Sequence, residues 1–157
     1  MSAVVGNRHL GVFAAVSMLA GCTHLNQSTC EAWTQKPNAE HTVHAFFDAL
    51  RKEDKAAFER LTTRSFYAFD GGKRYVGTEL VDLVKDAHNR GVELNWSVGS
   101  IDTELGCDVA WRAWENVGSA GTPPDLKPVR WLESAVLVHQ NAQWKIDFFH
   151  SQRAAVH

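Results

Sequence analysis

A long series of strand-like segments begins near Gly91, and this limits the possible folds more than any other feature. Before it, apolar residues recur every three or four positions in three segments, which is typical of amphipathic helices, and a short strand-like stretch at residues 65–76 separates the second segment from the third. After it, apolar and polar residues alternate over long segments, which is typical of strands. Helices followed by consecutive strands predict an α+β domain in which three helices pack on one face of a curved antiparallel sheet.

The expected elements are bounded by recognisable turn and cap residues. Helices are expected at residues 38–51, 55–61 and 78–90. Strands are expected at residues 65–69, 74–76, 92–103, 107–117, 129–140 and 143–151. Asp54 is a suitable N-cap for the second helix and Gly91 a suitable C-cap for the third. Asp70-Gly71-Gly72-Lys73 is a hairpin turn signal, and a Gly/Pro-rich loop is expected at residues 118–128.

Residues 1–21 have the pattern of a signal peptide. They contain one basic residue, Arg8, no acidic residue, and the apolar run from Leu10 to Ala20. Such a run rises only about 17 Å as a helix, whereas a membrane span takes roughly 20 residues. We therefore expect an export signal and not a permanent transmembrane helix.

The signal ends in Leu19-Ala20-Gly21-Cys22, which resembles the lipobox of bacterial lipoproteins. The resemblance implies that the chain is cut before Cys22, that a lipid on Cys22 anchors it, and that residues 22–37 form a stalk. Because Thr23 and not Asp follows the cysteine, it also implies the outer membrane, facing the periplasm. The alternative is an ordinary secretory signal that releases a soluble protein.

Two further cysteines, Cys30 and Cys107, remain once Cys22 carries the lipid. In an oxidising compartment these two thiols can form a disulfide. Alternatively, Cys107 is a small buried strand residue and Cys30 a free thiol in the stalk.

The sequence argues against several classes of ligand. The chain is weakly acidic, with 18 acidic and 16 basic residues, so no nucleic-acid surface is expected. His41 and His44 lie on one helix face, but no third ligand has suitable spacing, so no metal site is predicted. Since the chain also lacks a Gly-rich phosphate loop and a serine nucleophile elbow, no cofactor is predicted.

The order of elements resembles the nuclear transport factor 2-like superfamily, and its SnoaL-like branch and a related uncharacterised domain family most closely. The residues that carry the resemblance are segment 49–54 between helices, Phe69-Asp70-Gly71-Gly72 before a short strand, and the closing segment 144–151. It covers residues 38–151 and leaves 152–157 as a tail. It implies a cone-shaped fold with a deep pocket between helices and sheet, and a homodimer through the outer sheet face. Functions on this fold vary widely.

Ketosteroid isomerase, which has a similar helix order, needs a carboxylate base and two acidic hydrogen-bond donors, a Tyr and a protonated Asp. Aligned by eye, the base falls at Asp70 and the tyrosine at Phe46. The second acid falls near Ala135, two residues from Glu133 on the same strand face. Only Asp70 matches, and the conformation of an Asp-Gly turn explains that residue equally well.

A dehydratase-type reaction would instead ask for an Asp/His pair, and Asp147 with His150 is the candidate. Period two places Asp147 on one strand face and His150 on the other, which argues against the pair. Asp70, Asp147 and His150 are therefore weak catalytic candidates.

Tryptophan is the residue type most in excess, with six in the chain. Strand alternation predicts that Trp111 and Trp114 point to opposite faces of the sheet. One interpretation is that the Trp side chains fill the core and a dimer interface. The other is an aromatic ligand pocket. The expected pocket residues are Tyr67, Trp96, Trp111 and Asp147.

These observations favour an envelope lipoprotein whose domain binds a small apolar molecule or a protein partner without catalysis. The alternative is an isomerase, cyclase or dehydratase of the SnoaL or ketosteroid isomerase type, with a pocket carboxylate as general base. A buried pocket acid with a perturbed pKa would favour that alternative. A third class is a structural adaptor of an envelope assembly, which exposed aromatic surface on the outer sheet face would favour.

Overall fold

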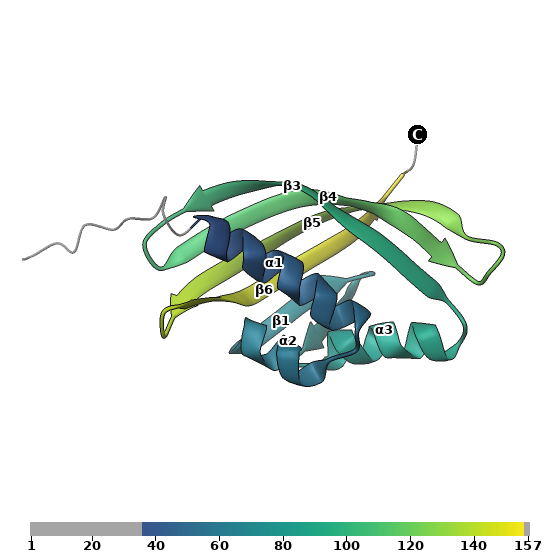
Figure 1. Cartoon of the computed structure of the whole chain (residues 1–157), viewed down its shortest axis with the longest axis horizontal. Coiled ribbons are helices and arrows are strands. Elements are labelled where there is room, and N and C mark those ends of the chain that lie inside the picture. The colour runs from purple at the N-terminus through teal and green to yellow at the C-terminus, as the bar shows by residue number, and fades with distance from the viewer. Residues whose placement is uncertain (1–35, 156–157) are drawn as a thin grey trace, which may run out of the picture.

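The computed structural model describes residues 36–155, and three helices lie on one side of a six-stranded sheet (Figure 1). The helices are α1 (Lys36–Arg51), α2 (Lys55–Leu61) and α3 (Glu79–Asn89). The strands are β1 (Thr62–Asp70), β2 (Lys73–Val76), β3 (Glu93–Leu105), β4 (Val109–Gly121), β5 (Lys127–Gln140) and β6 (Gln143–Ala154). No helix in this described part is long and apolar enough to cross a membrane.

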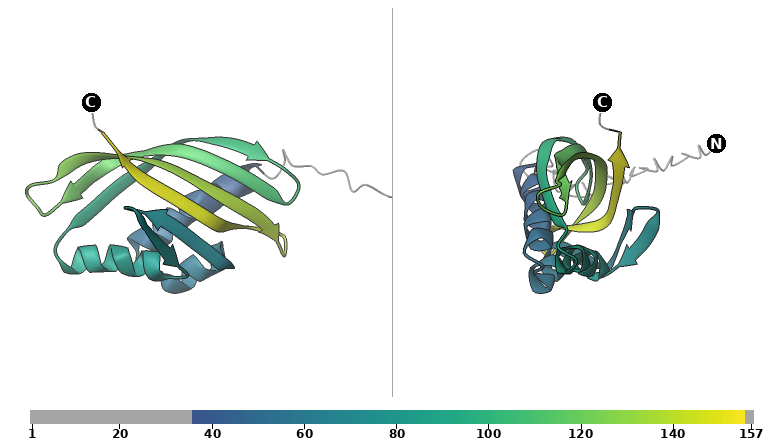
Figure 2. Two further views of the ribbon diagram at one scale, coloured as in Figure 1. Left: turned by 180° about the vertical axis from the view of Figure 1, so that it is seen from behind. Right: turned by 90° about the vertical axis from the view of Figure 1, so that its right-hand side faces the viewer.

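The strand order is β2-β1-β6-β5-β4-β3, and Figure 2 shows the curvature of this sheet from two further sides. The α+β class and the packing of three helices on a sheet are confirmed. The sheet is mixed and not purely antiparallel, because β6 inserts between β5 and β1 and runs parallel to β1. This parallel pair joins the end of the chain to the segment that follows the first two helices.

The long strands extend further than the sequence predicts. β4 continues to Gly121 and β5 begins at Lys127, so the expected loop 118–128 shortens to residues 122–126. Gly118 permits this extension, since a Cβ at that position would lie 1.8 Å from the carbonyl oxygen of Asn95 on β3. The glycine read as a loop residue is instead required where two strands come very close.

The local turn and cap signals are confirmed. Asp54 caps α2, where its Oδ1 accepts a 2.8 Å hydrogen bond from the amide of Ala57. Asp70 pairs with Lys73 across a two-residue turn in which Gly71 and Gly72 have φ of 54° and 76°. Such positive φ values at both central positions are the conformation that Asp-Gly turns favour in hairpins.

The core lies between the helices and the sheet. Phe46, on the inward side of α1, is fully buried and packs 4.9 Å from Phe58 and 5.2 Å from Phe149, measured between ring centroids. The residue aligned with the ketosteroid isomerase tyrosine therefore belongs to the aromatic core.

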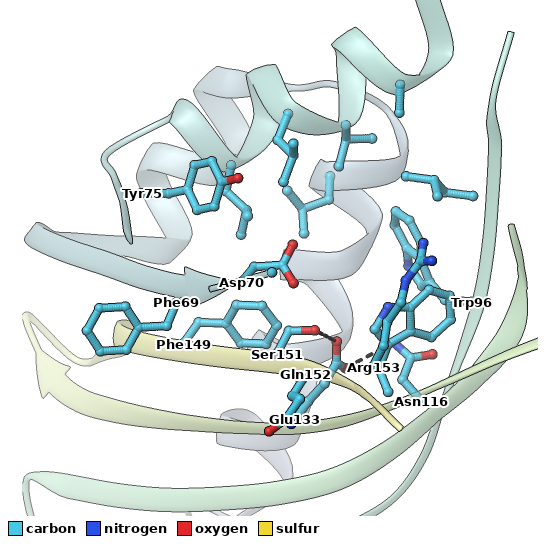
Figure 3. Close-up of a pocket in the computed structure, with 18 of the residues that line it drawn as sticks. Phe69, Asp70, Tyr75, Trp96, Asn116, Glu133, Phe149, Ser151, Gln152 and Arg153 are labelled. Carbon is cyan, nitrogen blue, oxygen red and sulfur yellow. Dashed lines mark hydrogen bonds between the residues drawn. The ribbon is translucent and has the colours of Figure 1, made fainter. Parts of the chain in front are cut away.

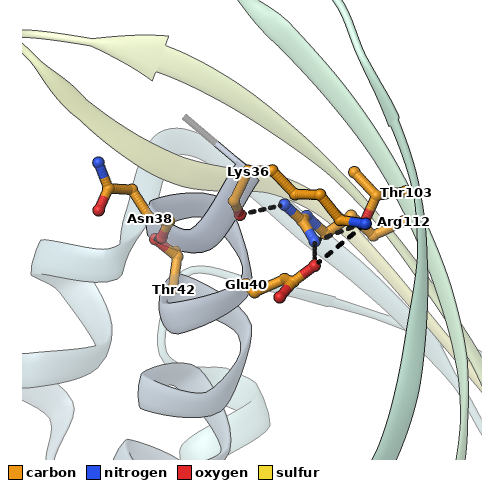
Figure 4. Close-up of polar contacts among 6 residues, drawn as sticks. All are labelled: Lys36, Asn38, Glu40, Thr42, Thr103 and Arg112. Atoms are coloured by element: carbon orange, nitrogen blue, oxygen red, sulfur yellow. Dashed lines mark hydrogen bonds and ion pairs between the residues drawn. The ribbon is translucent and has the colours of Figure 1, made fainter. Parts of the chain in front are cut away.

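Arg112 fastens the first turn of α1 to the sheet (Figure 4). Its guanidinium is fully buried, donates to the carbonyl of Lys36 at 3.0 Å and to Thr103 Oγ1 at 2.6 Å, and lies 3.5 Å from Glu40. Burial lowers the pKa of Arg112, while the Glu40 carboxylate opposes this shift. A buried cation needs such partners, so these contacts fix where α1 begins on β3 and β4.

Candidate functional site

A cavity of about 1000 Å³ lies between α3, the β1–β2 hairpin and the sheet (Figure 3). Its apolar wall comes mainly from α1, α3 and β3, and its polar wall from the ends of β1 and β6 and from the middle of β4 and β5. A largely apolar cavity with a few polar groups on one side is the common form of a small-molecule site.

Glu133 is the most deeply buried acid of this wall, with 6% of its surface exposed. Its Oε2 accepts hydrogen bonds from Trp114 Nε1 at 2.7 Å and from Asn116 Nδ2 at 3.0 Å. Its Oε1 lies 3.0 Å from Ser151 Oγ. Because Oε2 already accepts two N–H groups, the proton of the neutral acid belongs on Oε1, beside Ser151.

Burial raises the pKa of Glu133 to about 7 by penalising the charged form. The hydrogen bonds from Asn116, Ser151 and Trp114 oppose this shift, and the like charge of Asp70 adds to it. Near neutral pH this side chain therefore exists both as an acid that can donate a proton and as a carboxylate that can accept one.

Asp70 supplies a second carboxyl group to the same cavity. Figure 3 shows its carboxylate pointing from the end of β1 toward the helices. Burial raises its pKa, which the backbone amide of Gly71 and the charges of Arg153 and His150 partly counteract. The hairpin turn explains why an Asp stands here, and the same side chain also lines the cavity.

Tyr75, on β2, is the tyrosine that lines this cavity. Burial and the charges of Asp70 and Glu79 raise the pKa of its phenol, so the phenol keeps its proton and remains a hydrogen-bond donor. Phe46, which aligns with the ketosteroid isomerase tyrosine, has no hydroxyl group. Tyr75 on β2 supplies a phenol donor to the cavity instead.

An irregularity in β6 decides which of its residues face inward. Val136 pairs with Phe148 and Leu137 with Ile146, so Asp147 has no partner on β5. This bulge reverses the alternation, and Phe149 and Ser151 are buried on the same side as Trp144 and Ile146. Strict period two would place the two pairs on opposite faces.

The expected pocket residues divide between the cavity and the outside. Trp96 lines the cavity, and its indole also packs against Arg51, 5.7 Å from the ring centroid. The prediction was wrong for Trp111, which is 47% exposed on the outer face, whereas Trp114 is buried on the inner face. The two tryptophans do point to opposite faces.

Tyr67 was also wrongly placed in the pocket. It alternates with the buried Phe66 and Ala68 on β1, so it lies on the outer side, 5.0 Å from the Phe148 ring and beneath Arg74 at 4.1 Å. Strand alternation places Tyr67 on the face opposite to Phe66 and Ala68, but the sequence alone does not show which of these two faces points toward the core.

Asp147 and His150 do not form a catalytic pair. Asp147 lies outside the cavity, where its Oδ1 accepts hydrogen bonds from Thr63 at 2.5 Å and Ser65 at 2.7 Å. The bulge that leaves Asp147 unpaired on β5 directs it toward the start of β1. His150 is among the cavity residues, and its charge acts on Asp70.

The described residues test only part of the cysteine and metal predictions. Cys107 is disulfide-bonded. Cys22 and Cys30, the other two cysteines, lie outside the described residues, as do the signal peptide and most of the stalk. Within residues 36–155, no group of three or more His, Cys, Asp or Glu side chains is arranged to hold a metal ion.

Sequence reasoning missed most of the polar wall. Glu133 entered only as a neighbour of Ala135, and Asn116, Ser151 and Tyr75 were not considered. The signal that could have found Glu133 is its position among the buried Trp131, Ala135 and Leu137, which alternate on β5. An acid inside an apolar strand face is costly to bury, so it is a functional candidate.

No protein-family model matches this sequence, and neither does any curated protein sequence. Solved structures match its fold. A ketosteroid isomerase-like protein from Erwinia carotovora atroseptica is 14% identical, with a TM-score of 0.64 over 78% of this chain and 98% of that one. A protein of the NTF2-like family from Streptomyces avermitilis is 15% identical, with a TM-score of 0.64 over 78% of this chain and 98% of that one.

A third similar structure is the association domain of CaMKII from C. elegans. It is 18% identical, with a TM-score of 0.64 over 77% of this chain and 97% of that domain. Identities this low show a shared architecture and no shared activity. Three helices on a curved six-stranded sheet, with a deep cavity between them, give this chain the nuclear transport factor 2-like fold.

Proposed function

We propose that this protein is an exported lipoprotein whose domain binds a small, largely apolar carbonyl compound and transfers a proton on it. The observation that carries the proposal is the placement of two carboxyl groups, Asp70 and Glu133, in one cavity whose opposite wall is apolar. Two acids whose environments differ are what proton-transfer enzymes use for their base and their acid.

The two acids are suited to different roles. Asp70 retains more solvent access and is the base that removes a proton from the carbon next to the carbonyl. The electron pair of the broken C–H bond moves into an enolate, whose oxygen accepts a hydrogen bond from neutral Glu133 or from Tyr75. Asp70 then returns the proton to another carbon, which isomerises the compound, or to a leaving hydroxyl, which releases water.

The test of this role is deuterium exchange in D₂O with a panel of apolar ketones and enones, followed by NMR. The wild-type protein should exchange protons next to the carbonyl, and Asp70→Asn should slow this by about 100-fold or more, because it removes the base. Asp86→Asn, an equivalent change on the exposed side of α3, should leave the rate unchanged. Equal exchange rates in the wild type and Asp70→Asn would rule out Asp70 as the base.

A second candidate is binding without catalysis. It is favoured by the burial of Phe46 in the core, since the site then lacks the helix-borne tyrosine of ketosteroid isomerase. In the same NMR titrations, this alternative predicts ligand-induced shifts in the cavity and no deuterium incorporation at any carbon.

The lipid anchor rests on the resemblance of residues 19–22 to a lipobox. We expect the wild-type chain expressed in a two-membrane bacterium to sediment with the outer membrane and to incorporate an alkyne-labelled fatty acid. Cys22→Ser should lose both properties, and Thr23→Asp should shift the protein to the inner membrane. Recovery of unlabelled wild-type protein in the soluble periplasm would exclude the anchor.

The outer sheet face supports a homodimer as part of the same proposal. Val109, Trp111, Val117 and Leu132 are each 44–50% exposed on β4 and β5. Exposed apolar side chains on neighbouring strands are typical of a protein interface. One of the similar structures is an association domain, which agrees with assembly through this fold.

A further inference from the structure

Three cationic side chains line the same cavity from three different elements. Lys73 begins β2, Arg90 follows the last residue of α3, and Arg153 lies near the end of β6. The hairpin pairs Asp70 with Lys73, and the parallel register pairs Asp70 with Ser151, so the hairpin and the end of β6 lie side by side. All three cations are solvent-exposed, and we call them the cationic rim.

No described carboxylate lies within ion-pair distance of the cationic rim, although the charge of Arg153 acts on Asp70. Within residues 36–155, none of the three forms an ion pair, although Lys55, Arg112 and Arg130 elsewhere each have a carboxylate within 4 Å. Arg153 lies over the Trp131 ring at 6.0 Å. The cavity also holds Asp70 and Glu133, and because burial raises the pKa of Glu133 to about 7, the three cations still outnumber the negative charges there.

The cavity behind the rim is apolar on the side opposite the sheet. Leu80, Leu83, Val84 and Ala87 of α3 face Phe47 of α1 and Trp96 of β3 across it. The two acids stand on the sheet wall, where they would repel a negative group and accept an uncharged one. Among the described residues that line the cavity, the cationic rim supplies the lysine and arginine charges that can hold a negative group.

We infer that the ligand of this site is an amphiphilic anion, with an apolar body inside the cavity and a carboxylate, sulfonate or phosphate group held by Lys73, Arg90 and Arg153. This inference rests on the proposed function, because it assigns a class to the molecule that occupies the same cavity. Arginine forks bind planar or tetrahedral oxyanions through paired hydrogen bonds, which gives the rim its selectivity.

A matched pair of fluorescent probes tests this inference. 8-Anilinonaphthalene-1-sulfonate and N-phenyl-1-naphthylamine share one apolar body, and only the first carries a negative charge. Both are titrated into the full chain carrying Cys22→Ser, which prevents lipid attachment and keeps micelles out of the assay. We expect the sulfonate to bind about tenfold or more tightly than the uncharged probe, and less tightly as salt increases.

Variants test whether the cationic rim causes the tighter binding of the sulfonate probe. The double change Arg90→Gln and Arg153→Gln should weaken the sulfonate by about tenfold or more and leave the uncharged probe within about twofold. Arg64→Gln, on an exposed arginine of β1 outside the cavity, should change neither affinity. Leu83→Trp, which fills the cavity, should weaken both probes.

The outcomes separate this inference from the proposed function. Equal affinities for the two probes, or a sulfonate affinity that ignores the loss of Arg90 and Arg153, would overturn the anionic class. If Leu83→Trp still weakened binding of the uncharged probe, the cavity would remain a binding site, and this result would not overturn the proposed function. If neither probe bound, both proposals would fail together.

Discussion

At the scale of single residues, the unusual feature is an acid whose neutral and charged forms are both supported. Trp114 and Asn116 stabilise the carboxylate of Glu133, while its burial stabilises the neutral acid. Burial is the larger effect, and it raises the pKa to about 7. A structural carboxylate would be kept charged by a full ion pair, and Glu133 has none among the described residues.

This balance predicts a pH-dependent stability. The unfolded chain releases the Glu133 proton near pH 4.5, whereas the folded chain keeps it to about pH 7. Between these values the unfolded state binds fewer protons, so the free energy of unfolding falls as pH rises, by up to roughly 3 kcal/mol for this group. Burial raises the pKa of Asp70 as well, which adds a loss in the same direction.

Urea unfolding of the wild type and Glu133→Gln from pH 4 to 8 measures the contribution of Glu133. The Gln side chain keeps an acceptor for Trp114 and Asn116 and cannot ionise, so the wild type should lose stability relative to the variant as pH rises. Glu104→Gln, an exposed change on β3, should follow the wild-type curve. Parallel curves for the wild type and Glu133→Gln would show that Glu133 ionises normally.

At the scale of elements, the sequence predicts what depends on local chemistry. The cap at Asp54, the hairpin at Gly71 and Gly72 and the switch from helices to strands all follow from residue type and period, because each depends on the backbone nearby. The parallel pairing of β1 with β6 could not be predicted in this way. It depends on contacts between segments about 80 residues apart.

The candidate site was harder to predict because one extra residue in β6 reverses the strand's alternation. Without the bulge at Asp147, Ser151 would face away from Glu133, and the polar wall would lose its Oε1 partner. The two residues that follow the bulge, Phe148 and Phe149, are both apolar, so the period-two pattern does not show which of them faces inward. Asp70 was found because family resemblance pointed to it, whereas the bulge determines which residues of β6 surround it.

At the scale of the whole molecule, the cavity and the apolar outer face lie on opposite sides of the same sheet. Trp114 and Glu133 face the inner side, while Trp111 and Leu132, on the same two strands, face outward. In the proposed dimer, each copy would therefore build its cavity from its own chain. Assembly through the outer face and chemistry in the cavity should respond to separate mutations.

Leu132→Lys tests this separation, because it places a charge in the centre of the apolar outer face. Native mass spectrometry should detect a dimer for the wild type and a monomer for Leu132→Lys. Leu126→Lys, a matched change at an exposed leucine of the β4–β5 loop, should stay dimeric. The monomer should keep the affinity for the anilinonaphthalene probes. A Leu132→Lys dimer would place the contact elsewhere, whereas a monomer that lost probe binding would mean that the cavity depends on the partner.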